Sequence, residues 1–224
     1  MTVRYGLEDR TVLLTGAAGG IGQALARAFA AQGARLLLVD REAAALDALI
    51  ESLHSHRVHS AVCELGSDAA VADVAAQVGD RFGRLDVLVH NAGTEYPTPV
   101  DDASEGATAR WAALLDNNVS GMWRLTRSLL PCLPRGASVI HQSSIWGRIG
   151  VAGFSAYSAS KHAIVGLTRS LALELGPRGI LSRQAVPVML TPEDLADTFL
   201  FLASDGSAAL TGQCLCPSHG EVML

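Results

Sequence analysis

The chain has 224 residues, of which 49% are hydrophobic, and a formal net charge of −5. That length fits one α/β domain with a sizeable core and leaves little room for a second domain. Because the charges are spread along the chain without a block of lysine and arginine, no electrostatic signature of nucleic-acid or anionic-membrane binding is visible. No apolar segment has the length of a secretion signal or a membrane span, so we expect a cytoplasmic protein without a nucleic-acid or membrane partner. We expect reduced thiols and no metal site, since no CxxC pair is formed by Cys63, Cys132, Cys214 and Cys216.

Short apolar runs alternate with segments of helical length along the chain. The runs are Thr11–Leu14, Leu36–Val39, Val87–Val89 and Ser138–Ile140. Continuous apolarity indicates strands that are buried on both faces, as in a parallel sheet covered by helices. Right-handed crossovers between such strands predict one α/β domain over residues 1–224, a doubly wound parallel sheet with helices on both faces. Ligands bind to such sheets beyond the carboxyl ends of the strands.

A glycine-rich turn, with the pattern TGxxxGxG, follows the first run and leads directly into the helical pattern Gln23–Phe29. Glycines there allow the backbone to approach a pyrophosphate at a helix N-terminus, whose amides and dipole favour anions. A tight turn without a ligand is the alternative interpretation. The candidate cofactor-binding residues of this turn are Gly16, Gly19, Gly20, Ile21 and Gly22.

Asp40 ends the second run, eighteen residues beyond Gly22. In dinucleotide-binding folds a carboxylate at about this place accepts hydrogen bonds from the adenosine ribose, and it repels a 2′-phosphate. Arg41 follows immediately and offers such a phosphate a positive charge. The alternative role for Asp40 is a helix N-cap ahead of 42–45. We expect NAD to be the cofactor and NADP to be the less favoured one.

Tyr157 and Lys161 are four residues apart in Ser155–Leu175, a segment with a helical pattern. Their side chains therefore share one helix face. An isolated tyrosine has a pKa near 10, and a cation within about 4–6 Å lowers it by roughly one to three units. Ser144, thirteen residues before Tyr157, follows the apolar run Ser138–Ile140 and can donate a hydrogen bond to an oxygen that gains charge during reaction.

Together with Asn91-Ala92-Gly93 and Asn118, the motifs resemble those of the short-chain dehydrogenase/reductase family. The resemblance covers Leu7–Ile180 and resumes over Thr191–Gln213. It implies a Rossmann fold and NAD-dependent hydride transfer between a secondary alcohol and a ketone. It also implies that Tyr157 is the general acid/base, that Lys161 binds the nicotinamide ribose and lowers the tyrosine pKa, and that Ser144 polarises the substrate oxygen.

The resemblance implies further contacts. Asn118 would hold a water that links Lys161 to a proton relay, although a packing or helix-kink asparagine is the alternative. The remaining cofactor contacts would come from Asn91, Ala92, Gly93, Glu64 and Leu65.

Related proteins are homo-oligomers, and we expect a dimer or tetramer that pairs the helices at 111–130 and 157–175. Besides further copies of the chain, we expect a small alcohol or ketone as the substrate. A catalytically impaired protein of this family, with a nucleotide-sensing or regulatory role, is the alternative function.

The sequence departs from the family pattern after Ile180. Only ten residues separate Ile180 from Thr191, which has the pattern of an N-cap with Pro192 in the first helical turn. The polar residues of 181–187 are poor material for a buried strand. We therefore expect the sixth strand to be absent and the substrate-covering segment to be missing or shortened, which leaves the final strand, Cys214–Cys216, without a neighbour. A true deletion and an incomplete sequence are both open explanations.

Overall fold

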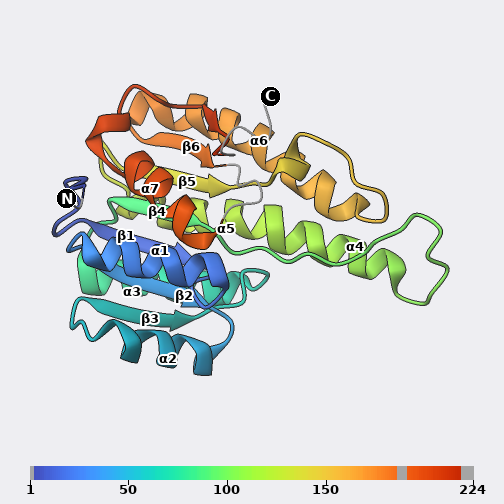
Figure 1. The fold of residues 1–224 in the computed structure, drawn as a ribbon, viewed down its shortest axis with the longest axis horizontal. Helices are drawn as coiled ribbons and strands as arrows, with labels where there is room; N and C mark the ends of the chain where they lie inside the picture. The colour runs from blue at the N-terminus through green and yellow to red at the C-terminus, as the bar shows by residue number, and fades with distance from the viewer. Residues whose placement is uncertain (1–2, 186–190, 218–224) are drawn as a thin grey trace.

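The computed structural model describes residues 3–185 and 191–217. Its seven strands form one parallel sheet with the order β3-β2-β1-β4-β5-β6-β7 (Figure 1). The order reverses between β1 and β4, which is the place where ligands bind in doubly wound sheets. The strands are β1 (Thr11–Thr15), β2 (Arg35–Asp40), β3 (Val58–Val62), β4 (Val87–His90), β5 (Ser138–Gln142), β6 (Leu181–Ala185) and β7 (Cys214–Leu215).

Helices cover both faces of the sheet, with α1, α2 and α7 on one face and α3, α5 and α6 on the other (Figure 1). They are α1 (Gly20–Ala31), α2 (Ala43–Leu53), α3 (Asp68–Phe82), α4 (Ala107–Leu115), α5 (Gly121–Leu129), α6 (Ser155–Leu175) and α7 (Pro192–Ala203). Short 3-10 turns lie at Leu130–Cys132, Ile145–Gly147, Gly176–Arg178 and Asp205–Ser207.

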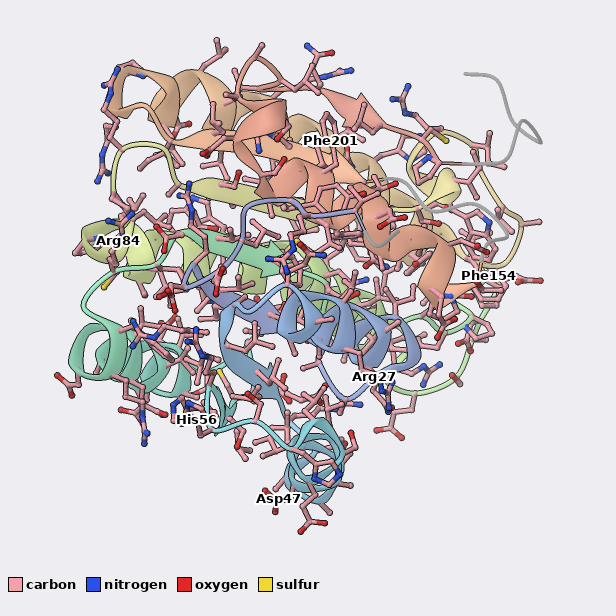
Figure 2. All side chains as sticks on the ribbon, turned by 60° about the vertical axis from the view of Figure 1, so that its left-hand side comes forward. Arg27, Asp47, His56, Arg84, Phe154 and Phe201 are labelled. Carbon is pink, nitrogen blue, oxygen red and sulfur yellow. The ribbon has the colours of Figure 1, made fainter. Side chains whose placement is uncertain are left out.

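The apolar residues of β1 alternate between two cores. Val12 and Leu14 pack with Phe29 of α1, whereas Leu13 packs against the helices of the opposite face. All three β1 side chains are fully buried, as expected for a strand covered on both sides. Charged side chains such as Asp47 of α2 lie at the surface instead (Figure 2). The doubly wound fold expected from the sequence is confirmed.

Most predicted elements are present, with ends that differ by a residue or two. The helix expected over 155–175 forms as α6 with those bounds. The helix expected over 111–130 is interrupted, because a π-helical turn, Asp116–Ser120, separates α4 from α5. Such turns insert one extra residue into the helical hydrogen-bond pattern and often occur at functional sites.

The expectation that the sixth strand is absent is wrong. Residues 181–185 form β6, which pairs with β5 on one side and with β7 on the other, so the final strand has a neighbour. Of the polar side chains in this strand, Arg183 finds internal partners: it donates from Nε to the Leu210 carbonyl at 2.6 Å and from Nη1 to Ser138 Oγ at 2.6 Å. Pairing the open backbone edges of β5 and β7 outweighs the poor side-chain pattern.

The helix start expected at Thr191 is present. Thr191 Oγ1 accepts from the Asp194 amide at 3.3 Å, and Asp194 Oδ2 accepts from the Thr191 amide at 3.0 Å, which completes a capping box. Pro192 begins the helix. The expectation of a shortened substrate-covering segment concerns 186–190, which lie outside the described residues. Within the described ranges, no helix is both long and apolar enough to cross a bilayer.

Candidate active site and cofactor pocket

The glycine-rich turn has no room for a side chain at Gly16 or Gly22. Gly16 has φ +65°, and a Cβ at this position would lie 2.7 Å from the Ala92 Cα. A Cβ at Gly22 would lie 2.0 Å from the Gly16 carbonyl oxygen. The N-cap of α1 is Gly19, which has no side chain to bond the first helical amides. Those amides therefore remain available to an anion.

Asn91 holds this turn in place from the end of β4. Its Nδ2 donates to the carbonyls of Thr15 at 3.0 Å and Gly16 at 2.9 Å. In return, Thr15 Oγ1 accepts from the backbone amides of Asn91 and Ala92, each at 3.1 Å. The side chain of Asn91 thus acts on the glycine-rich turn through backbone contacts, and its amide donor is already engaged by the protein.

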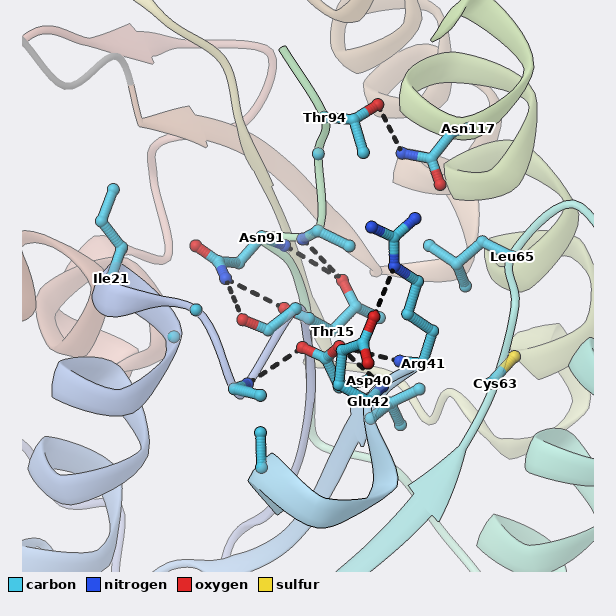
Figure 3. A pocket seen from close by; sticks show the side chains of 18 of the residues that line it. Thr15, Ile21, Asp40, Arg41, Glu42, Cys63, Leu65, Asn91, Thr94 and Asn117 are labelled. Carbon is cyan, nitrogen blue, oxygen red and sulfur yellow. Dashed lines mark hydrogen bonds and ion pairs between the residues drawn. The ribbon is translucent and has the colours of Figure 1, made fainter. Parts of the chain in front are cut away.

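A cavity of about 600 Å³ opens above these loops (Figure 3). Its glycine-lined floor, the helix N-terminus and the carboxylate at the end of β2 together form a donor and acceptor set that fits the pyrophosphate and ribose of a dinucleotide. The predicted residues that line it are Gly16, Gly19, Gly20, Ile21, Gly22, Asp40, Arg41, Glu64, Leu65, Asn91, Ala92 and Gly93. The cavity is also lined by residues that the sequence did not indicate as cofactor contacts, among them Glu42, Thr94, Asn117, Gln142 and Pro192.

Asp40 joins the end of β2 to the glycine-rich turn. Its Oδ2 accepts from the Ala18 amide at 3.0 Å, and its Oδ1 accepts from the Arg41 and Glu42 amides at 2.8 and 3.3 Å. The N-cap of α2 is Glu42, without a capping side-chain hydrogen bond, so the alternative role of Asp40 as the N-cap residue is not what the structure shows. A carboxylate has about four acceptor sites, so Asp40 retains room for a hydroxyl.

Tyr157 and Lys161 lie one turn apart on α6, and the Lys161 Nζ is 5.4 Å from the centre of the Tyr157 ring. Lys161 is buried, and its Nζ donates to the Gln142 carbonyl at 3.2 Å. A Cβ on Gly93 would lie 3.4 Å from Nζ. The ammonium is therefore held directly behind Gly93 and Gln142, which both line the cavity, although Tyr157 and Lys161 do not line it themselves.

Ser144 follows β5 and begins the turn that leads towards α6. Its Oγ accepts from the Trp146 amide at 3.2 Å and lies within hydrogen-bonding reach of the Tyr157 side chain. Trp146 makes edge-to-face contacts with Tyr157, at 5.4 Å between ring centres, and with Phe154, at 5.0 Å. Trp146 and Phe154 thus form an apolar wall beside the phenol.

The chain alone raises the pKa of Tyr157 to about 12. Burial is the main cause, the negative charge of Glu95 adds to it, and the Ser144 hydrogen bond opposes it. Burial also lowers the pKa of Lys161 to about 8, against the opposing influence of Glu95. The expected lowering of the tyrosine pKa by Lys161 does not offset burial in the absence of a cofactor. Glu95 was not expected at the site, although its place two residues after Asn91-Ala92-Gly93 is a signal that could have pointed to it.

Asn118 lies in the π-helical turn and is fully buried. Its Oδ1 accepts from the Thr94 amide at 2.8 Å, and its Nδ2 donates to the Thr94 carbonyl at 2.9 Å and to Ser160 Oγ at 3.2 Å. The side chain thereby ties the loop after β4 to α6, one residue before Lys161. This is a packing role at a helix distortion, and a role in holding water stays a proposal.

Comparisons with known proteins agree with this geometry. A family model described as short chain dehydrogenase matches residues 10–197. The chain belongs to the short-chain dehydrogenase/reductase family. Its relatives include the (2S)-[(R)-hydroxy(phenyl)methyl]succinyl-CoA dehydrogenase subunit BbsD of Thauera aromatica, which is 35% identical over 96% of this chain and 98% of that protein. The 3-oxoacyl-[acyl-carrier-protein] reductase FabG of Thermotoga maritima is 30% identical over 97% and 99% of the two chains.

Among solved structures, a short-chain dehydrogenase/reductase from Brucella melitensis, titled glucose/ribitol dehydrogenase, has a TM-score of 0.93. It is 30% identical, and the match covers 99% of this chain and 100% of that one. The alignment with the Thauera protein extends over 247 positions, more than the 224 residues of this chain, so that relative carries residues that this chain lacks. The chain therefore belongs to a family of oxidoreductases and has a shorter sequence than that relative.

Proposed function

We propose that this protein is an NAD-dependent oxidoreductase that interconverts a secondary alcohol and a ketone by hydride transfer. The observation that carries the proposal is the grouping of Ser144, Tyr157 and Lys161 at the carboxyl end of β5, beside a cavity suited to a dinucleotide. When bound, the nicotinamide supplies or accepts the hydride. The chain supplies the acid, the base and the geometry.

Tyr157 is the proposed acid/base, with its proton held at Oη. In ketone reduction it donates this proton to the substrate oxygen, and in alcohol oxidation it removes the proton. Ser144 donates a hydrogen bond to the same oxygen as negative charge develops there. Lys161 presents its Nζ from behind Gly93, where it contributes positive charge and a donor to the ribose side of the site.

Activation of Tyr157 requires more positive charge than the chain provides. With the pKa of Tyr157 raised to about 12, little phenolate exists near neutral pH. The oxidised nicotinamide carries a positive charge, and an opposite charge within about 4–6 Å lowers a tyrosine pKa. Alcohol oxidation should therefore depend on cofactor binding before proton removal.

We propose NAD as the preferred cofactor because Asp40 presents a carboxylate where a 2′-phosphate would lie. Like charges disfavour that phosphate, whereas a ribose hydroxyl can donate to the carboxylate. The substrate is a small alcohol or ketone. We further propose a cytoplasmic location and a homo-oligomer, either a dimer or a tetramer, in which α4, α5 and α6 contribute the contacts.

A nucleotide-sensing or regulatory role is the second candidate. The sequence feature that favours it is the short connection between β6 and α7, with only residues 186–191 between them. An open substrate side admits water, which weakens the electrostatic effects on which catalysis depends. The complete set of Ser144, Tyr157 and Lys161 favours the enzyme instead, since binding alone does not require an acid/base.

The test is to incubate the protein with NAD and a panel of secondary alcohols, and with NADH and the matching ketones, while following the absorbance of NADH. Turnover with any member of the panel supports the enzyme. Tight NADH binding, measured by fluorescence, without turnover of any member would favour the nucleotide-sensing role.

A further inference from the structure

An ion pair lies on the wall of the cavity that faces the proposed adenosine ribose. The Arg41 Nε is 3.3 Å from Glu42 Oε1, and both residues line the cavity beside Asp40 (Figure 3). We propose that Glu42 is a cofactor-specificity residue, which neutralises Arg41 and so keeps it from recruiting a 2′-phosphate. This inference rests on the proposed dinucleotide function.

The Asp40 carboxylate is engaged by backbone amides, and Glu42 is therefore the side-chain partner of Arg41. The Asp40 carboxylate accepts hydrogen bonds from the backbone amides of Ala18, Arg41 and Glu42. These bonds fix its orientation towards the glycine-rich turn and the start of α2. The guanidinium of Arg41 is instead paired with the Glu42 carboxylate. Asp40 thus contacts the glycine-rich turn and remains available to the ribose, while Glu42 pairs with the Arg41 guanidinium.

The charge balance at this wall favours NAD. Asp40, Arg41 and Glu42 together carry a net charge of −1, and a guanidinium engaged by a carboxylate cannot offer its full fork of donors to a phosphate. Without Glu42, the wall would be neutral and Arg41 would be free to bind a phosphate. A residue at the start of α2 would thereby convert an arginine that favours NADP into one that does not.

The ion pair between Arg41 and Glu42 is exposed to solvent, so it acts on charge and contributes little to the fold. The side chains of Arg41 and Glu42 are 56% and 68% exposed, and exposed ion pairs contribute little stability. Neutralising Glu42 should therefore leave the fold intact. Freeing the Arg41 guanidinium corresponds to about tenfold in phosphate affinity, for a unit positive charge roughly 6 Å from a unit negative charge at an effective dielectric constant of about 40.

The experiment measures dissociation constants of NADH and NADPH by nucleotide fluorescence, which does not depend on turnover. The proteins compared are the wild type, Glu42→Gln, Arg41→Ala and the double variant. Glu42→Gln should lower the ratio of the NADPH to the NADH dissociation constant about tenfold. In the Arg41→Ala background the same substitution should lower the ratio much less, because the released guanidinium is absent.

The matched control is Glu51→Gln, which removes the same charge from the other end of α2 and should leave the ratio unchanged. An unchanged ratio in Glu42→Gln, or an equal change with and without Arg41, would overturn the inference while both nucleotides still bind. If neither nucleotide binds to the wild type, the proposed function itself fails, and the inference fails with it.

Discussion

The ammonium of Lys161 lies 5.4 Å from the ring centre of Tyr157, and the carboxylate of Glu95 acts on both groups in the same direction. Negative charge from Glu95 raises the pKa of the phenol and that of the ammonium. The pKa of Tyr157 is therefore set by three contributions: burial, an anion on the loop after β4 and the hydrogen bond of Ser144.

Glu95→Gln should lower the pKa of Tyr157, because removing a nearby negative charge favours the phenolate. The pH at which alcohol oxidation reaches half of its maximum should fall by about 0.5–1 unit. Lys161→Ala removes a positive charge and should move this midpoint upward, while also weakening NADH binding. The control is Glu174→Gln at the far end of α6. A midpoint that rises in Glu95→Gln would contradict this electrostatic account.

Gly22→Ala should disrupt the glycine-rich turn, since its Cβ would lie 2.0 Å from the Gly16 carbonyl oxygen and 2.8 Å from the Ala17 Cα. Both are backbone atoms, so the turn must shift, and we expect a loss of about 2–4 kcal/mol in the free energy of unfolding. Gly20→Ala is the matched control, because a Cβ there has nothing within 4 Å. Urea unfolding without nucleotide measures both. Equal stabilities would show that the packing argument is wrong.

The buried histidines His90 and His141, on the paired strands β4 and β5, should make the protein less stable in acid. The rings are fully buried and stacked 5.0 Å apart, and their partners are the hydroxyls of Thr126 and Thr168. Burial lowers the pKa of His141 to about 4 and holds the pKa of His90 well below its usual value. Because the unfolded rings bind protons more readily, stability should be complete above about pH 6.5 and fall towards pH 4.

The expected loss from His141 alone is about 3 kcal/mol across that window. His141→Leu should flatten the pH dependence of urea unfolding between pH 7 and pH 5. His56→Gln, at an exposed turn beyond α2, should leave it unchanged (Figure 2). If wild-type stability were equal at pH 7 and pH 5, the buried pair would not be titrating as described.

Exposed apolar residues on α5 and α6 indicate self-association. Leu173 is 81% exposed and Trp123 is 45% exposed, although both are large and apolar. Such residues are typical of surfaces that another subunit covers. Light scattering at micromolar concentration should give at least twice the monomer mass of 23.4 kDa. Leu173→Glu should reduce that mass, whereas Val100→Glu, on the loop after β4, should not. A wild-type monomer would contradict the assembly.

The arrangement of the fold could be predicted from the sequence where local patterns are strong. Residues 12–14 and 36–39 are apolar throughout, so their burial on both faces follows directly, and the glycine spacing leaves few other uses for the turn at Gly16. The bounds of α6 follow from a long helical pattern. Tyr157 and Lys161 are placed by that helix, which is why their proximity was predictable.

The remaining features depend on contacts between distant residues, which a sequence pattern does not reveal. The polar residues Ser182, Arg183 and Gln184 argue against a buried strand at 181–185. The open edges of β5 and β7 nevertheless require a strand, and Arg183 finds acceptors on Leu210 and Leu202. Burial lowers the pKa of Arg183 to about 10, because desolvation disfavours the charged guanidinium.

The pKa of Tyr157 could not be predicted for a similar reason. Its direction depends on how deeply the phenol is buried and on Glu95, which is more than sixty residues away in the sequence. Likewise, the ion pair between Arg41 and Glu42 could not be predicted, because it depends on the Asp40 carboxylate accepting hydrogen bonds from three backbone amides.

The most direct test of the central claim is the turnover of Tyr157→Phe, measured together with its affinity for NADH. The substitution removes only the hydroxyl, so the aromatic contact with Trp146 and the cofactor pocket should be retained. We predict that kcat falls at least about a hundredfold, as for loss of a general acid/base, while the NADH dissociation constant changes less than about threefold. Near-native turnover of Tyr157→Phe on a substrate that the wild type converts would contradict the account.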